Sequence, residues 1–173
     1  IGFCLVGSEM CIRDRINGGS TTGMTLASGA TINVDADEVD HLLADETANR
    51  LTISDQVITV TNAITVDQAN LLGATTTGKL TATIATTETV TELATLSADG
   101  GTNDLTVVIR SDDATAATAA QLNTINAATA VAVDLTNVTA LAGSSLSDLG
   151  TLATAIGNNA VSYTHLRAHE TEA

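Results

Sequence analysis

The sequence predicts an α/β fold in the form of a repeat solenoid, built from short parallel strands and short helices with about 27 residues per unit. Two observations lead to this prediction: β-branched runs of strand length recur along the chain, and a helix-start signature follows each of them. A strand–helix unit of that length gives parallel strands joined by right-handed crossovers. Units of this kind stack in series, and each one contacts only its neighbours.

Five short runs rich in Val, Ile and Thr are the expected strands, because these residues suit a pleated surface. Residues 80–84 alternate apolar and polar side chains, as a half-buried strand does. Residues 107–109 are apolar throughout, which fits a strand of a parallel sheet with both faces buried. The five runs are residues 31–34, 57–60, 80–84, 105–109 and 131–135.

A capping-box signature follows each expected strand. In such a box the first side chain accepts a hydrogen bond from the helix start, and the side chain three residues on reaches back to the cap residue's own N–H. The caps are spaced by 30, 24, 29 and 27 residues, and apolar residues three apart follow each one. This pattern predicts five short amphipathic helices. The five boxes are Asp35/Glu38, Thr65/Gln68, Thr89/Glu92, Thr118/Gln121 and Ser145/Asp148.

The ends of the units are less uniform. Gly73, Gly100–Gly101 and Gly157 are expected to end helices, because glycine tolerates positive φ. Residues 16–34 are rich in Gly and Thr and are interpreted as a β-rich lead-in or linker, and residues 51–54 as an extra edge strand. The competing fold is an all-β solenoid whose helices are only turns, since short helices rich in Thr and Asn are weak by propensity.

The composition limits the partners. The 173 residues carry 20 acidic and six basic side chains, and only 1% of them are aromatic. The core must therefore consist of small aliphatic side chains. The net charge of −14 predicts no binding to nucleic acid or to anionic membranes. No apolar run is long enough to insert into a bilayer.

The two ends of the chain are related through DNA. Residues 161–171 and residues 5–14 can be encoded by opposite strands of one DNA segment, and that segment resembles the adapter attached to sequencing-library fragments. Residues 1–15 and 161–173 are therefore expected to be translated adapter and not native. The repeat array is expected to span residues 35–160. Residues 16–160 carry 16 acidic and three basic residues and no aromatic side chain.

This interpretation removes most of the apparent site chemistry. His165 and His169 have the i, i+4 spacing of metal ligands on a helix, but they lie in the expected adapter, as do Cys4 and Cys11. His41 is then the one remaining histidine, on the polar side of the first helix. No serine, cysteine or second histidine is placed to form a catalytic dyad with it, so we expect no enzyme and no catalytic residue.

Residues 99–104 are the remaining candidate for metal binding. Asp99, Asn103 and Asp104 surround two glycines, and their hard oxygen ligands are those that calcium prefers. A plain helix-to-strand turn uses the same residues. A second acidic cluster, formed by Asp35, Asp37, Glu38 and Asp40, is explained by its position at a helix start, where the helix dipole favours carboxylates.

Residues 64–84 and 129–141 are rich in Ala, Thr, Val and Asp, and in this they resemble the repeats of very large secreted or surface bacterial proteins. Some of those proteins are adhesin-like, and some carry calcium-binding repeats. The resemblance implies an extracellular or cell-surface location. It implies a structural or adhesive module whose partners are neighbouring repeats of the same parent chain and a surface or matrix ligand. A calcium-dependent binding module and an enzyme fragment are the alternatives.

Overall fold

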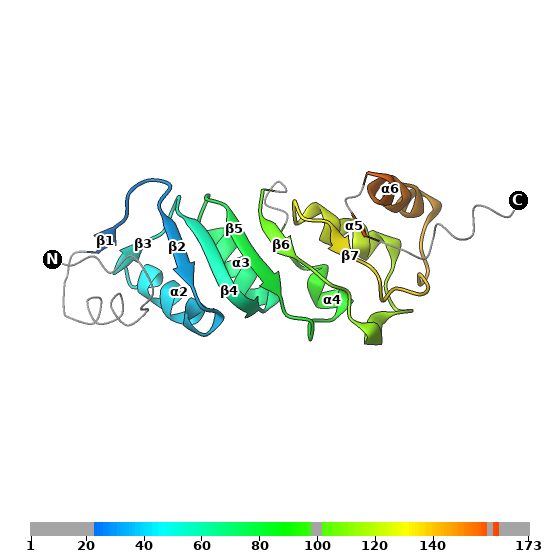
Figure 1. Cartoon of the computed structure of the whole chain (residues 1–173), viewed down its shortest axis with the longest axis horizontal. Helices are drawn as coiled ribbons and strands as arrows, with labels where there is room; N and C mark the ends of the chain where they lie inside the picture. Colours follow the sequence, from blue (N-terminus) through cyan, green and yellow to red (C-terminus); the bar gives the residue numbers. More distant parts are fainter. Residues whose placement is uncertain (1–22, 98–101, 159–160, 163–173) are drawn as a thin grey trace, which may run out of the picture.

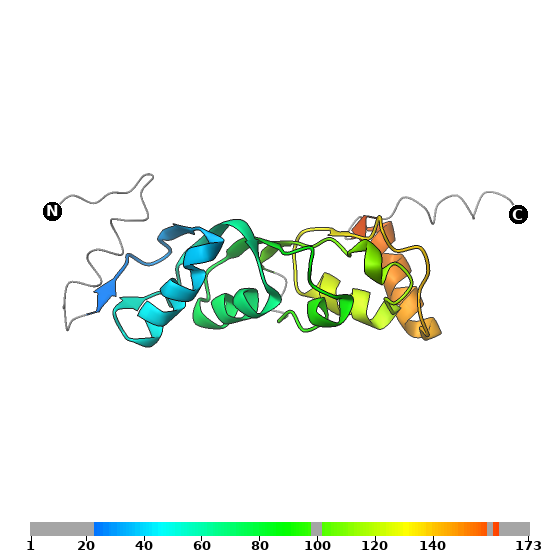
Figure 2. The same ribbon diagram turned by 90° about the horizontal axis from the view of Figure 1, so that it is seen from below.

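The chain has an α/β fold with parallel strands. The structure is a computed structural model that describes residues 23–97, 102–158 and 161–162. The strands and helices follow one another along an elongated molecule (Figure 1). Turned by 90°, the same molecule shows helices in a row on one side of the strands (Figure 2). Every strand pair among the described residues is parallel.

The main sheet has four strands in the order β2-β4-β5-β6. Each strand lies beside the strand of this sheet that comes next in the sequence, so the helical connections cross over from one strand to its neighbour. The expected strands at residues 31–34 and 80–84 are confirmed with the same bounds. The four strands are β2 (Thr31–Val34), β4 (Val57–Ile64), β5 (Leu80–Ile84) and β6 (Asp104–Thr106).

Two smaller parallel pairs flank the main sheet. At one end β1 (Met24–Thr25) pairs with β3 (Leu51–Thr52), and at the other β7 (Val133–Asp134) pairs with β8 (Val161–Ser162). An isolated parallel bridge between Val108 and Asp134 connects the chain after β6 to β7. The expected strands at residues 51–54 and 131–135 are therefore present but shorter.

Helices follow the strands, so the all-β alternative is wrong. Two 3-10 turns also occur among the described residues: η1 (Ala36–Glu38) precedes α2, and η2 (Ser111–Asp113) precedes α5. The helix expected after Thr89 is reduced to a single turn, which is α4. The five α-helices of the described residues are α2 (Val39–Thr47), α3 (Val66–Thr75), α4 (Val90–Leu93), α5 (Ala119–Ala127) and α6 (Leu146–Gly157).

Three of the five predicted capping boxes are confirmed in full, at Thr65, Thr89 and Thr118. In each box the cap hydroxyl accepts from the backbone N–H three residues on, and that residue's side chain accepts from the cap N–H. At Ser145 the first half of the box is present. Asp35 departs from the pattern: its carboxylate caps η1 through the Asp37 N–H, and α2 begins after that turn.

The prediction that glycines end the helices is wrong for Gly73 and correct in position for Gly157. Gly73 lies inside α3, and Gly157 is the last residue of α6. Neither has a positive φ, which among the described residues occurs at Gly29 and Asn49. Helix α3 ends instead at Thr76, whose backbone is extended and whose hydroxyl bonds to the chain before β4. Gly100 and Gly101 lie outside the described residues.

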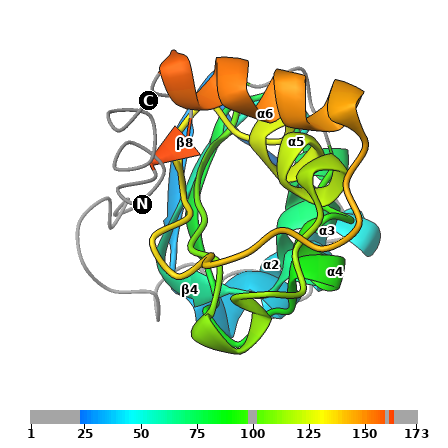
Figure 3. The same cartoon turned by 90° about the vertical axis from the view of Figure 1, so that its right-hand side faces the viewer.

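The core is one apolar layer between the strands and the helices. It consists of Val, Ile, Leu and Ala, as the composition predicts. In Figure 3, seen along the molecule, α3, α4 and α5 lie on the side opposite β4. The largest fully buried side chains come from both layers and include Ile58, Ile64, Leu72, Leu80, Ile84, Leu93, Ile109, Leu122 and Ile125.

We predict that Gly78→Ala destabilises the protein. A Cβ at Gly78 would collide with the backbone carbonyl oxygens of Gln56 and Asp55, so the chains before β4 and β5 would have to separate. The expected loss in the free energy of unfolding is about 1–3 kcal/mol in urea titrations. Gly150→Ala is the matched control: a Cβ there meets open space inside α6, and alanine favours the helix. An equal effect of the two substitutions would contradict the prediction.

Candidate functional site: polar contacts between neighbouring segments

Four buried polar residues stand at the edge where the chain enters successive strands. We call them the corner residues, and we call a strand together with the helix that follows it a segment. Their exposed fractions lie between 2 and 7 %. A buried polar group is costly unless it is hydrogen-bonded, so the partners of these side chains decide their role. The corner residues are Gln56, Thr76, Asn103 and Thr129.

Thr129 has the most complete set of partners. Its hydroxyl accepts from the Leu105 N–H at 2.9 Å and donates to the Leu105 carbonyl at 2.8 Å. It also accepts from the Val131 N–H at 3.1 Å. One donor and two acceptor positions are thus used, which is the full capacity of a hydroxyl group. The side chain therefore joins the start of β6 to the chain that leads into β7.

The other corner residues make the same kind of contact to the segment before them. The Asn103 Oδ1 accepts from the Leu80 N–H at 2.9 Å, and the Thr76 hydroxyl donates to the Gln56 carbonyl at 2.7 Å. The Gln56 Nε2 donates to the Ala27 carbonyl at 3.1 Å. At each strand entrance, a backbone group of one segment is bonded by a side chain from the next.

A second set of contacts lies at the opposite edge, where helices begin. The backbone N–H of the first helical residue is bonded by a side chain from the following segment. The Asp113 carboxylate accepts from Val90 at 2.8 Å, and the Ser144 hydroxyl accepts from Ala119 at 2.9 Å. Because the first N–H groups of a helix have no partner within the helix, these contacts satisfy groups that would otherwise be unpaired.

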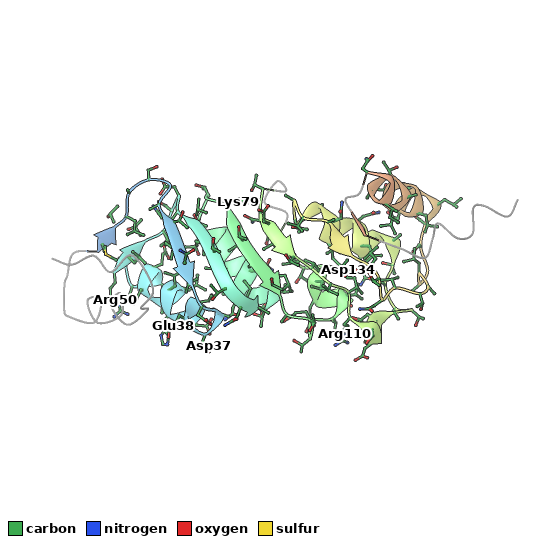
Figure 4. All side chains as sticks on the ribbon, in the orientation of Figure 1. Asp37, Glu38, Arg50, Lys79, Arg110 and Asp134 are labelled. Atoms are coloured by element: carbon green, nitrogen blue, oxygen red, sulfur yellow. The ribbon has the colours of Figure 1, made fainter. Side chains whose placement is uncertain are left out.

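Carboxylates are concentrated at this second edge. Figure 4 shows Asp37, Glu38 and Arg110 there, and Lys79 at the opposite edge. Among the described residues every Lys and Arg takes part in an ion pair. Arg110 pairs with Asp113 at 3.0 Å and Arg50 with Asp45 at 3.1 Å, while Lys79 pairs with Asp104. The remaining carboxylates leave the surface strongly acidic.

Two carboxyl groups near helix starts, those of Asp35 and Glu88, have shifted pKa values. The Asn62 side chain donates to both oxygens of Asp35, at 3.0 and 2.9 Å, and lowers the pKa of that carboxyl. Burial and the charge of Glu92 raise the pKa of Glu88. A lowered pKa contributes stability above the ordinary pKa, and this is lost as the pH falls through the folded-state pKa. The raised pKa of Glu88 contributes stability at low pH, and this stability is lost as the pH rises through its folded-state pKa.

The calcium candidates are held by other partners where the structure describes them. Asp99 lies outside the described residues. Asn103 is a corner residue whose Oδ1 is bonded to Leu80, and the Asp104 carboxylate is paired with Lys79. Asp35 and Asp40 accept from Asn62 and from Gln68 of the next segment. In the described part of the chain, no group of three or more His, Cys, Asp or Glu residues is arranged to hold a metal ion.

Of the remaining candidates, only His41 lies in the described part of the chain. His41 lies exposed on α2. Cys4, Cys11, His165 and His169 lie outside the described residues. The corner residues Gln56, Thr76 and Thr129 were missed by sequence reasoning, because a single Thr or Gln before a β-branched run is common. The recurrence of one such residue before several strands was the available signal.

Comparison of the chain with protein-family models, with curated proteins and with solved structures finds no match. Among the described residues, no helix has the length and apolar character needed to span a membrane. The chemistry of the site follows from its own geometry. In that geometry, side chains of one segment bond backbone groups of the segment before it. The corner residues are buried, which leaves them inaccessible to a ligand.

We predict that Thr129→Val destabilises the protein although it preserves the shape of the side chain. The substitution leaves the buried Leu105 N–H without its acceptor, at an expected cost of about 1–3 kcal/mol in the free energy of unfolding. Thr106→Val, at an exposed position of the sheet, is the control and should change stability by less than about 0.5 kcal/mol. Equal stability of the Thr129→Val variant and the parent protein would show that the hydroxyl is not needed.

We further predict that calcium does not shift the unfolding midpoint. Recruiting Asn103 to a metal ion would remove the acceptor of the Leu80 N–H, and recruiting Asp104 would break its pair with Lys79. Thermal unfolding is to be followed with millimolar Ca²⁺ and with chelator. A rise in the midpoint with Ca²⁺ that Asp104→Asn abolishes would instead support a calcium-dependent binding module.

Proposed function

We propose that this protein is a non-catalytic structural or adhesive repeat module of a large secreted or cell-surface bacterial protein. Its strand–helix segments are the units of an α/β solenoid with about 27 residues per unit. In this proposal residues 35–160 form the array, and residues 1–15 and 161–173 are translated adapter. The function of the array is to extend the parent chain and to present a regular surface.

The sequence separation of the contacts between segments carries this proposal. Side-chain hydrogen bonds that cross from one segment to another join residues between 20 and 29 positions apart, from the Ser28–Asp55 contact near one end to the Asn123–Asp148 contact near the other. This separation is about one unit. Contacts restricted to nearest neighbours are the defining property of a solenoid.

The exposed side of the main sheet supports a presenting or adhesive role. Thr31, Asn33, Thr83 and Thr106 are exposed on strands β2, β5 and β6, while the residues next to them along each strand are half-buried or buried. In Figure 1 no helix covers these strands from the viewer's side. A uniform surface of short polar side chains, without rings or a pocket of convergent charged groups, suits display better than catalysis.

We predict that one unit does not fold alone. A single strand–helix pair cannot bury its apolar stripe, so a peptide of residues 105–131 should be unfolded by far-UV circular dichroism. Truncation of the chain after residue 128 should lower the unfolding midpoint, because it removes β7 and α6 and with them the interface between α5 and α6. Cooperative folding of the isolated peptide would contradict the repeat proposal.

A further inference from the structure

The first residue of α6 differs from the first residue of every other α-helix in the described chain. Val39, Val66, Val90 and Ala119 begin α2, α3, α4 and α5, and their exposed fractions lie between 0 and 3 %. Leu146 begins α6 and is 89 % exposed. A single exposed leucine is ordinary on a protein surface, but here four equivalent positions are buried.

At two of these helix starts, a side chain from the following segment accepts a hydrogen bond from the first N–H of the helix. Asp113 bonds the Val90 N–H from 23 residues on, and Ser144 bonds the Ala119 N–H from 25 residues on. In two successive segments, an Asp or Ser oxygen from the next segment thus accepts from the first N–H of the helix.

Leu146 also belongs to the apolar stripe of its helix. Leu149, Leu152 and Ile156 follow it at helical spacing, and they are buried or partly buried in the core. Leu146 thus extends the buried stripe by one turn and does not lie on a separate solvent-facing side. In Figure 3, α6 lies across the end of the molecule that faces the viewer.

We propose that the first turn of α6 is a docking surface for one further strand–helix unit of the same kind. That unit covers Leu146 with apolar side chains and places an Asp or Ser oxygen at the Leu146 N–H. The surface continues the interface that already joins α4 to α5 and α5 to α6. The inference rests on the proposed repeat array and adds to it the residues by which the array grows.

The experiment extends the chain at this surface. Residues 161–173 are replaced by a second copy of residues 105–128, which places the copied Asp113 23 residues after Leu146, the separation between Asp113 and Val90. Leu146→Ala is introduced into the full chain and into the extended chain, and thermal unfolding is followed by far-UV circular dichroism. Leu71→Ala is the matched control, because Leu71 is 55 % exposed on the interior helix α3.

We expect the extension to raise the unfolding midpoint and the helical signal. Leu146→Ala should leave the midpoint of the full chain unchanged but lower that of the extended chain by at least about 4 °C. Leu71→Ala should have the same effect in both chains. An extension that remains unfolded, or a Leu146→Ala effect that is the same in both chains, would overturn the docking surface. The repeat proposal itself would fail separately, through cooperative folding of the isolated 105–131 peptide.

Discussion

The structure depends on hydrogen bonds that buried backbone groups at the strand entrances and helix starts make to the neighbouring segment. The N–H groups of Leu80 and Leu105 are buried, and each is bonded by a side chain from the following segment. An unpaired buried N–H costs free energy comparable to a lost hydrogen bond, so a segment removed from its neighbour would have to expose these groups to water. Apolar packing and polar satisfaction therefore both require a neighbour.

This constraint explains the unusual composition. The apolar layer between strands and helices is filled by Val, Ile, Leu and Ala, and no aromatic side chain is among its buried residues in the described chain. Threonine serves several positions: it caps helices at Thr65, Thr89 and Thr118, and it bridges segments at Thr76 and Thr129. Because its hydroxyl both donates and accepts, one residue type satisfies backbone groups of both kinds.

The sequence was sufficient to predict the local elements whose signals are local. The boxes at Thr65, Thr89 and Thr118 depend on residues three apart, and they were predicted correctly with the helices that follow. The end of α3 was not predicted, because this helix ends through the Thr76 contact to a distant carbonyl and not through Gly73. The role of Asn103 was missed for the same reason: its partner, Leu80, is 23 residues away in the sequence. Such contacts depend on the register between segments, which no short motif encodes.

Native-state hydrogen exchange measures directly how strongly the hydrogen bonds between segments protect the buried backbone N–H groups. We expect the Leu80, Val90 and Leu105 amides, which are bonded to side chains of the neighbouring segment, to be protected as strongly as amides inside the helices. We also expect Thr129→Val to lower the protection of Leu105 more than that of Leu80. Exchange of these three amides at the rate of an unstructured peptide, while the helical amides remain protected, would show that hydrogen bonds between segments do not hold the structure together.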